Sequence, residues 1–270
     1  MQSIIHFSRV SRLLATFLVG LLHSVHTVAA QQGRPAWERV EAIQTLLNGA
    51  VPRPEAVRLD LPSVTQDGSS VLVTAEIDSP MTPDNHVEEL YLFALGNPSP
   101  ELAEIRFTPL AGRASVSTRI RLDRSQTVVA LARTSGGDWL SGSRDVRVTV
   151  SGCLSRDATY QADDVMQTRV RVPPRFKAGQ ASDIRTLINH PMETGLREDA
   201  AGQPIPEQII ELFQARLDDA PVLTVRLHRA IAANPYLVFH MAPEQSGELT
   251  LSWEEDTGET TVTTAEIRVD

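Results

Sequence analysis

The sequence contains few of the features that define common classes of enzyme. It has one cysteine, Cys153, among 270 residues, so no disulfide can form within the chain. After residue 30, no apolar run approaches the roughly 20 residues that a membrane-spanning helix needs. The chain has no glycine loop for phosphates, no zinc-spaced cysteine and histidine pair, and no serine nucleophile elbow. These absences indicate no independent enzyme, no cofactor and no membrane span.

The first thirty residues are typical of a secretory signal. Arg9 and Arg12 form a basic start without acidic residues, a short apolar core runs from Leu13 to Leu22, and small residues end at Ala30. We therefore assign residues 1–30 as a cleavable signal peptide and not as a membrane span. The two arginines are not adjacent, which favours the general secretory route over the twin-arginine route. We expect a periplasmic protein.

The net charge argues against two kinds of partner. The formal charge is −9, and loss of the two positive charges of Arg9 and Arg12 with the signal changes it to −11. Nucleic acid and anionic membranes repel so acidic a chain, and we expect neither as a partner. In an oxidising compartment, a lone cysteine is either buried and inert, paired with another chain, or kept for chemistry.

Hydrophobic periodicity predicts a short helix and then an all-β fold. Apolar residues recur at helical spacing over residues 37–47, and Asn48-Gly49 is a plausible stop. From residue 57 the period changes to two, and Val128 to Ala132 is continuously apolar, as in a strand buried on both faces. About seven short strands with turn signals between them predict an antiparallel sandwich of immunoglobulin-like type.

A polar segment separates this region from a second one. Residues 154–167 contain several charged residues and few apolar ones, and a loop of this length is unusual inside a compact domain. We therefore predict a linker at 154–167 between two sandwich domains, at 31–153 with the N-terminal helix and at 168–270. In the second domain alternation resumes. Residues 209–217 fit both strand and helix, and we favour strand.

Two sets of polar side chains are secondary candidates for a site. The histidines after residue 30 do not lie at metal-ligand spacing, and the best functional candidate is His190, which precedes a proline in a turn. A structural histidine is nevertheless the commoner case. Arg119 and Arg121 alternate along one strand, which predicts a solvated face, with an anion-binding or docking surface as the alternative.

Cys153 is the main candidate. The neighbouring Gly152 has no side chain and a free choice of backbone angles, so another protein can approach the thiol closely. A thiol is the most nucleophilic side chain in the sequence once it ionises. An exposed Cys153 can therefore accept a group, hold it and present it, while partner enzymes supply the activation.

The first region resembles SoxY, the sulfur-carrying subunit of the periplasmic thiosulfate-oxidising system. The resemblance lies in five stretches, at 78–82, 97–100, 107–114, 117–122 and 148–153. The last of these stretches matches the end of SoxY, where the carrier cysteine lies. The second region resembles SoxZ, most specifically over Leu187-Ile188-Asn189-His190-Pro191-Met192-Glu193-Thr194-Gly195. Ile205-Pro206, Asn234-Pro235-Tyr236 and 249–253 agree in order.

The resemblance implies two immunoglobulin-like sandwiches that pair with each other, and a non-enzymatic role. In SoxY the cysteine carries covalent sulfur intermediates between enzymes that load, oxidise and hydrolyse them, which makes Cys153 the expected carrier, flanked by Gly152. SoxY normally ends in Gly-Gly-Cys-Gly-Gly. Here Ser151 replaces the first glycine, Leu154 and Ser155 replace the last two, and the cysteine is internal. A partner must therefore admit a passing loop.

The sequence thus predicts a periplasmic carrier of a covalent sulfur or related intermediate. Its partners are periplasmic sulfur-oxidising enzymes, or a quinoprotein dehydrogenase and a c-type cytochrome, because fused SoxYZ-like carriers that resemble this chain are associated with such systems. Two alternatives stay open. In one, the protein is a non-covalent adaptor of a dehydrogenase–cytochrome system with an incidental cysteine. In the other, Cys153 links two copies in a disulfide-bonded homodimer.

Overall fold

The computed structural model describes residues 35–149 and 164–270. The expected signal peptide (1–30), Gly152, Cys153 and most of the expected linker lie outside the described residues. The chain divides into two units, Met1–Leu46 and Leu47–Asp270, and each is described by itself. In the described ranges, no helix is both long and apolar enough to cross a membrane.

The predicted short helix is present, in two pieces. A 3-10 helix, η1 (Ala36–Arg39), follows Pro35, and the α-helix α2 (Glu41–Leu47) follows it. Between them Val40 is extended, with φ −97° and ψ 114°, so the helical period is interrupted there. After α2, Asn48 and Gly49 take φ of 45° and 84°. This left-handed pair ends a helix as expected from the Asn-Gly sequence.

The strands of the first region follow the predicted alternation closely. They are β1 (Arg58–Asp60), β2 (Val64–Thr65), β3 (Val71–Ile77), β4 (Val87–Ala94), β5 (Glu101–Phe107), β6 (Ala114–Ile120), β7 (Gln126–Thr134) and β8 (Trp139–Val148), with the 3-10 turn η2 (Pro109–Ala111) after β5. All five residues from Val128 to Ala132 are fully buried. The continuous apolar run therefore marks a strand with both faces covered, as predicted.

The second region is also made of strands. They are β9 (Thr168–Arg171), β10 (Ser182–Ile188), β11 (Glu193–Thr194), β12 (Glu207–Gln208), β13 (Ile210–Leu217), β14 (Ala220–Leu227), β15 (Tyr236–Met241), β16 (Gly247–Glu255) and β17 (Thr260–Ile267). The ambiguous segment at 209–217 is the strand β13. Its apolar residues at alternate positions face the core, which decides between the two periods.

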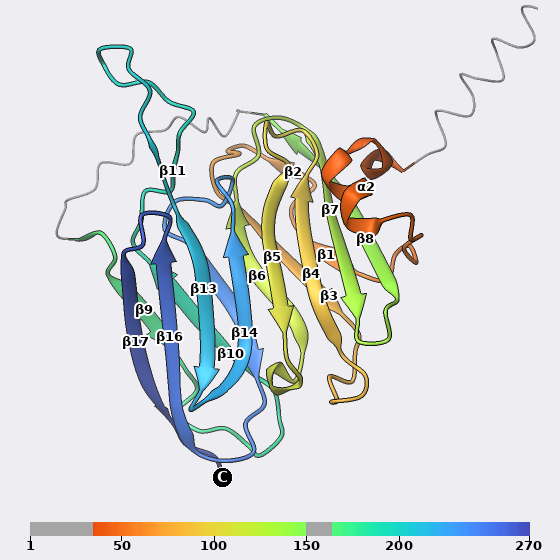
Figure 1. Cartoon of the computed structure of the whole chain (residues 1–270), viewed down its shortest axis with the longest axis vertical. Coiled ribbons are helices and arrows are strands. Elements are labelled where there is room, and N and C mark those ends of the chain that lie inside the picture. The colour runs from red at the N-terminus through yellow and green to blue at the C-terminus, as the bar shows by residue number, and fades with distance from the viewer. Residues whose placement is uncertain (1–34, 150–163) are drawn as a thin grey trace, which may run out of the picture. The chain divides into compact units, whose positions relative to one another are not determined.

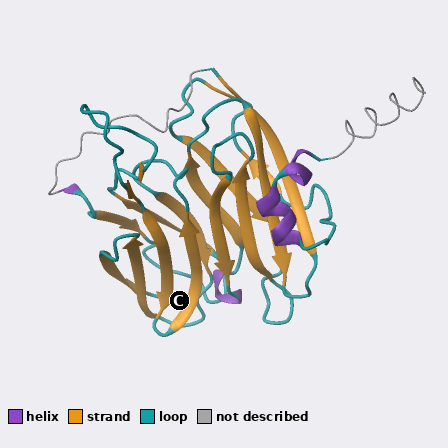
Figure 2. Ribbon diagram, turned by 45° about the horizontal axis from the view of Figure 1, so that its top comes forward, coloured by secondary structure: helices purple, strands orange, loops and turns teal. Residues whose placement is uncertain are grey.

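Two layers of sheet contain most of these strands (Figures 1 and 2). The six-stranded sheet has the order β1-β3-β6-β15-β10-β9, and the nine-stranded sheet has the order β17-β16-β13-β14-β5-β4-β7-β8-β2. β11 and β12 form a separate two-stranded ribbon. Most strand pairs are antiparallel, and the short pair of β2 and β8 is parallel. The all-β, sandwich-type fold is as predicted.

The two regions are joined through both sheets. In the nine-stranded sheet, β14 of the second region pairs with β5 of the first, from Leu223↔Phe107 to Leu227↔Ala103. In the six-stranded sheet, β15 pairs with β6 at Leu237↔Thr118 and Val238↔Ser117. Buried apolar residues from both regions form one continuous cluster between the layers. Two edges that would otherwise be open to other chains are thereby covered, and the regions share one core.

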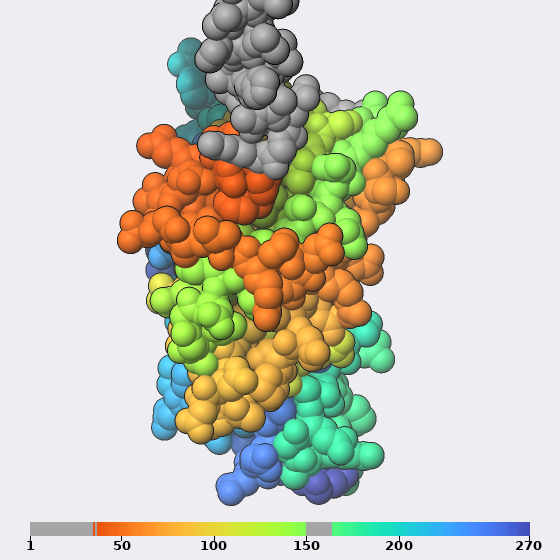
Figure 3. Space-filling view, turned by 90° about the vertical axis from the view of Figure 1, so that its right-hand side faces the viewer, coloured from red at the N-terminus to blue at the C-terminus, as the bar shows by residue number. Residues whose placement is uncertain are grey.

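The first region ends in a strand that is fixed on both sides. Residues from about 50 to 65 pack beside β8 in Figure 3, where Arg53 bridges to Leu140 and β2 pairs with β8. At Gly142 the contact is so close that an added Cβ would overlap the carbonyl oxygen of Val57. Only glycine therefore fits at this point of β8, the strand that leads toward Cys153.

Candidate functional site

The chain that leads to Cys153 is anchored up to Thr149. Its backbone N–H donates to the carbonyl of Thr65 at 3.0 Å, and its hydroxyl donates to the same oxygen at 3.2 Å. One residue earlier, the N–H of Val148 donates to the Ser125 hydroxyl at 3.0 Å. Three residues lie between Thr149 and Cys153 in the sequence.

A second anchor holds the chain where it returns. The N–H of Met166 donates to the carbonyl of Asn189 at 2.8 Å, and the N–H of Asn189 donates to the carbonyl of Gln167 at 2.8 Å. The Met166 side chain is buried. The stretch that carries Cys153 is thus tied at one end to the first region and at the other to the second.

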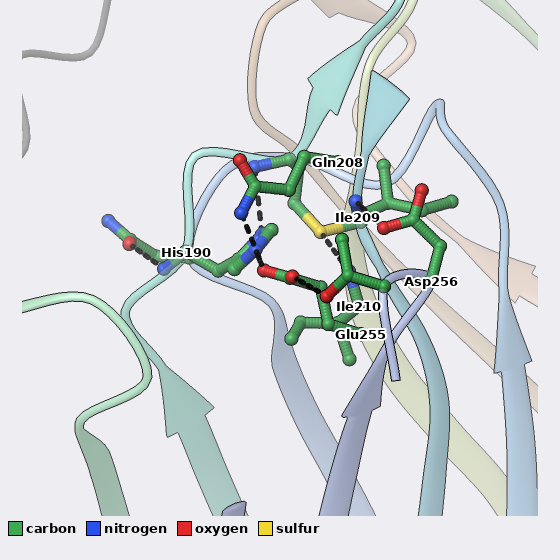
Figure 4. Close-up of polar contacts among 9 residues, drawn as sticks. His190, Gln208, Ile209, Ile210, Glu255 and Asp256 are labelled. Carbon is green, nitrogen blue, oxygen red and sulfur yellow. Dashed lines mark hydrogen bonds and ion pairs between the residues drawn. The ribbon is translucent and has the colours of Figure 1, made fainter. Parts of the chain in front are cut away.

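Asn189 leads directly into a buried polar cluster around His190 (Figure 4). The ring of His190 is fully buried, and its Nδ1 accepts the backbone N–H of Met192 at 3.0 Å. Because Nδ1 is an acceptor, the ring proton lies on Nε2, which donates to Glu255 Oε1 at 2.8 Å. The imidazole is therefore held as one neutral tautomer between two fixed partners.

Glu255 is the charged member of this cluster. Its carboxylate, only 2 % exposed, also accepts the Gln208 side-chain amide at 3.0 Å and the Thr257 hydroxyl. Burial raises the pKa of Glu255, but the bonds from Thr257, His190 and Gln208 outweigh it and hold the pKa below its ordinary value. Burial lowers the pKa of His190 against the opposing effect of the Glu255 carboxylate. The pair is consequently a neutral histidine beside a carboxylate.

Arg121 connects this cluster to the first region. It lies just after β6, is 8 % exposed, and donates from Nη1 to the carbonyl of Met192 at 2.8 Å and from Nη2 to that of Pro191 at 3.1 Å. The predicted solvated face is therefore wrong for Arg121. Arg119 does lie on the outer surface, with its guanidinium carbon 4.9 Å from the centre of the Tyr236 ring.

These contacts explain why the stretch from His190 to Gly195 is so specific in sequence. Met192 has φ of 52°, an uncommon conformation for a residue with a side chain. Its sulfur accepts the backbone N–H of Ile210 at 3.3 Å, while its own N–H and carbonyl bind His190 and Arg121. The stretch is a turn that locks the two regions together. His190 has a structural role here, since its ring is closed to a substrate.

His86 and His228 have other partners. His86 Nδ1 lies 3.1 Å from the carbonyl of Thr82, and His228 Nε2 lies 3.3 Å from Glu104 Oε1. In the described ranges, no group of three or more histidine, cysteine, aspartate or glutamate side chains is arranged to hold a metal. The sequence contained one signal for the buried Glu255, because this residue continues the alternate, inward-facing positions Leu249, Leu251 and Trp253.

Comparison with protein families gives two matches. Residues 43–153 match the family model of SoxY, described as "Sulfur oxidation protein SoxY", and residues 170–266 match that of SoxZ, described as "Sulphur oxidation protein SoxZ". The SoxY match ends on Cys153. A comparison with curated proteins finds no match.

Solved structures that are similar to this chain include the sulfur carrier protein SoxY from Chlorobium limicola f thiosulfatophilum. It is 24% identical, with a TM-score of 0.36, over 43% of this chain and 100% of that one. A putative superoxide reductase from Thermotoga maritima is 18% identical, with a TM-score of 0.30, over 36% and 87%. The superoxide reductase (neelaredoxin) from Ignicoccus hospitalis is 16% identical, with a TM-score of 0.31, over 35% and 80%.

The two family models together span both regions of the β fold and the turn that joins them. SoxY and SoxZ are carrier proteins of sulfur oxidation and not enzymes, which confirms the expected non-enzymatic role. The chain is therefore a fusion of a SoxY domain and a SoxZ domain, and it belongs to these sulfur oxidation families.

Proposed function

We propose that the protein is a periplasmic carrier that holds a sulfur intermediate covalently on Cys153 and presents it to partner enzymes. The observation that carries this proposal is the position of Cys153, the only cysteine of the chain, at the last residue of the SoxY match. The anchors at Thr149 and Met166 support it, because they hold the chain on both sides of the stretch that carries the thiol.

Loading would form a bond between Cys153 Sγ and the terminal sulfur of a sulfur oxyanion such as thiosulfate. Joining a thiol to such an anion releases one proton and two electrons, which a c-type cytochrome would accept one at a time. Hydrolysis would then break the bond between the two sulfur atoms that came from thiosulfate. Water supplies oxygen to the departing sulfate, one of its protons goes to the sulfur left on the cysteine, and the other is released. No electron transfer accompanies that second step.

The proposed setting is a quinoprotein dehydrogenase and c-type cytochrome system. It is supported by the internal position of Cys153 and by the replacement of the flanking glycines of SoxY with Ser151, Leu154 and Ser155. Because the chain continues on both sides of Cys153, the active site of a partner must admit a loop, whereas a terminal cysteine enters as a single chain end. Periplasmic location is supported by the signal-like residues 1–30.

The test is to replace the thiol in the native host and to measure the oxidation of reduced sulfur. Cys153→Ser should abolish the activity, while Ser155→Ala, a matched change two residues away, should retain it. Full activity of Cys153→Ser would overturn the carrier proposal. If, in addition, a pull-down with Cys153→Ala recovers as much dehydrogenase as the wild-type protein does, the protein acts as a non-covalent adaptor. Non-reducing electrophoresis of the wild-type protein tests the disulfide-linked homodimer.

A further inference from the structure

The outer face of the six-stranded sheet collects arginine and apolar side chains from both regions. In one row, Leu72 of β3 is opposite Arg119 of β6, and Tyr236 of β15 is opposite Leu187 of β10, which is opposite Arg169 of β9. The stacking of Arg119 on Tyr236 joins the two halves of this row. All five side chains are exposed or half-buried.

A second row runs beside the first. Val238 of β15 is opposite Arg185 of β10, which is opposite Arg171 of β9. Residues two apart on a strand point to the same face, so both rows form one surface, and the intervening Thr118 and Thr186 are buried on the other side. We call the surface that these two rows form the arginine face, and its charged residues are Arg119, Arg169, Arg171 and Arg185.

The arginine face is positive on a chain whose net charge is −9. Arg185 is paired with Asp183 at 2.8 Å. No carboxylate in the described ranges lies within ion-pair distance of Arg119, Arg169 or Arg171. A hollow of about 210 Å³ at its edge is lined by Arg171, Arg185, Pro173 and Pro174, and by Asp183, which is already paired with Arg185 and leaves Arg171 as the guanidinium without a carboxylate partner there. Guanidinium groups at the wall of such a hollow favour a carboxylate from outside the chain.

We propose that the arginine face is the docking surface for an acidic partner protein, and this choice of partner rests on the proposed carrier function. The face spans about 19 Å across five strands, a size that suits a weak and transient interface. Exposed arginine and tyrosine beside apolar side chains are typical of protein interfaces. An anionic lipid surface fits less well, because the charge of the whole chain opposes it.

The position of the arginine face relative to the carrier segment supports the same partner. β9 begins at Thr168, two residues after the anchor at Met166, and the anchoring Asn189 directly follows β10. A protein bound on β9 and β10 therefore sits where the chain returns from Cys153.

The experiment places a photo-crosslinking amino acid at Val238, within the arginine face, and at Gln214, an exposed position of β13 in the other sheet, as control. Crosslinking is carried out in the native host. Two double variants are compared, Arg169→Glu with Arg171→Glu and Arg144→Glu with Arg216→Glu. Both remove the same charge from exposed positions, and the second pair lies on β8 and β13. Urea unfolding checks that each variant is folded.

The proposal predicts a protein crosslink from position 238 to a peptide rich in aspartate and glutamate. Its yield should fall about tenfold in the Arg169 and Arg171 variant and little in the control variant, since reversed charges at an interface weaken the encounter. Adducts on Cys153 are measured in the same cells, so failure of docking and failure of the carrier function are distinguished. Equal yields in the two variants, a crosslink only from position 214, or a crosslink to lipid would overturn the proposal.

Discussion

Arg119 and Arg121 provide a sharp test of how the two regions are held together. They are two residues apart in sequence, yet Arg119 stacks on the half-buried Tyr236 while Arg121 is buried and bonds to two carbonyls of the second region. We compare Arg121→Met with Arg119→Met. Methionine keeps the apolar length of the side chain and removes the charged donors, so the comparison isolates the hydrogen bonds.

The expected loss for Arg121→Met follows from its partners. A hydrogen bond from a charged donor contributes about 1.5–3 kcal/mol, and a buried carbonyl left without a donor costs about 1–3 kcal/mol. Relief from burying the guanidinium offsets part of this loss. We therefore expect Arg121→Met to lower the free energy of unfolding by ~3 kcal/mol. Arg119→Met should lower it by less than about 1 kcal/mol, the contribution of an exposed cation–π contact.

Urea unfolding followed by tryptophan fluorescence measures both losses. Arg121→Met should lower the urea midpoint by ~1 M, given a slope of a few kcal/mol per molar urea. A transition that splits in two would indicate that the regions unfold separately once the lock is broken. Equal midpoints for the two variants, or a larger loss for Arg119→Met, would refute the role assigned to Arg121.

Two further predictions concern pH and backbone contact. Burial lowers the pKa of His190 below the 6.5 of the free side chain, so below that pH the unfolded chain binds a proton that the folded chain excludes. Stability should fall as pH decreases through this range, by at most about 1.4 kcal/mol per pH unit for each such histidine. His240 contributes in the same direction, because burial and then Arg113 lower its pKa. The variant His190→Gln should therefore reduce the slope of the unfolding free energy against pH without abolishing it. An unchanged slope would contradict a neutral His190. Gly142→Ala should lower the free energy of unfolding by about 2 kcal/mol through the clash with the Val57 carbonyl. The control Gly136→Ala, at a position with room for a methyl group, should change it by less than about 0.5 kcal/mol. Similar thermal unfolding midpoints for the two variants would contradict the close contact.

The local structure could be predicted well from the sequence because it depends on nearby residues. The run from Val128 to Ala132 indicated a strand covered on both faces, and its burial confirms this. The Asn48-Gly49 pair indicated the end of a helix, and both residues take positive φ. Alternation also favoured strand at 209–217, which is β13. In each case the signal lies in neighbouring residues, as hydrophobic periodicity or as a pair that favours positive φ.

The polar network could not be predicted, because its members meet only in the folded chain. Arg121 and Met192 are 71 residues apart, and His190 and Glu255 are 65 residues apart. Alternation predicted one solvated face for both arginines, but β6 ends at Ile120 and Arg121 lies beyond it. Pairing of the edges of β5 and β14 likewise depends on the second region, and the first region's sequence does not specify it.

The central claim is that Cys153 carries the cargo, and mass spectrometry of the protein purified from its native host tests it most directly. The measurement is peptide mapping of the purified protein under non-reducing conditions after growth on reduced sulfur, with Cys153→Ser as control. The account predicts mass additions of sulfur or sulfur oxyanions on the Cys153 peptide alone, removed by a thiol reductant. A thiol that stays unmodified under these conditions would contradict it.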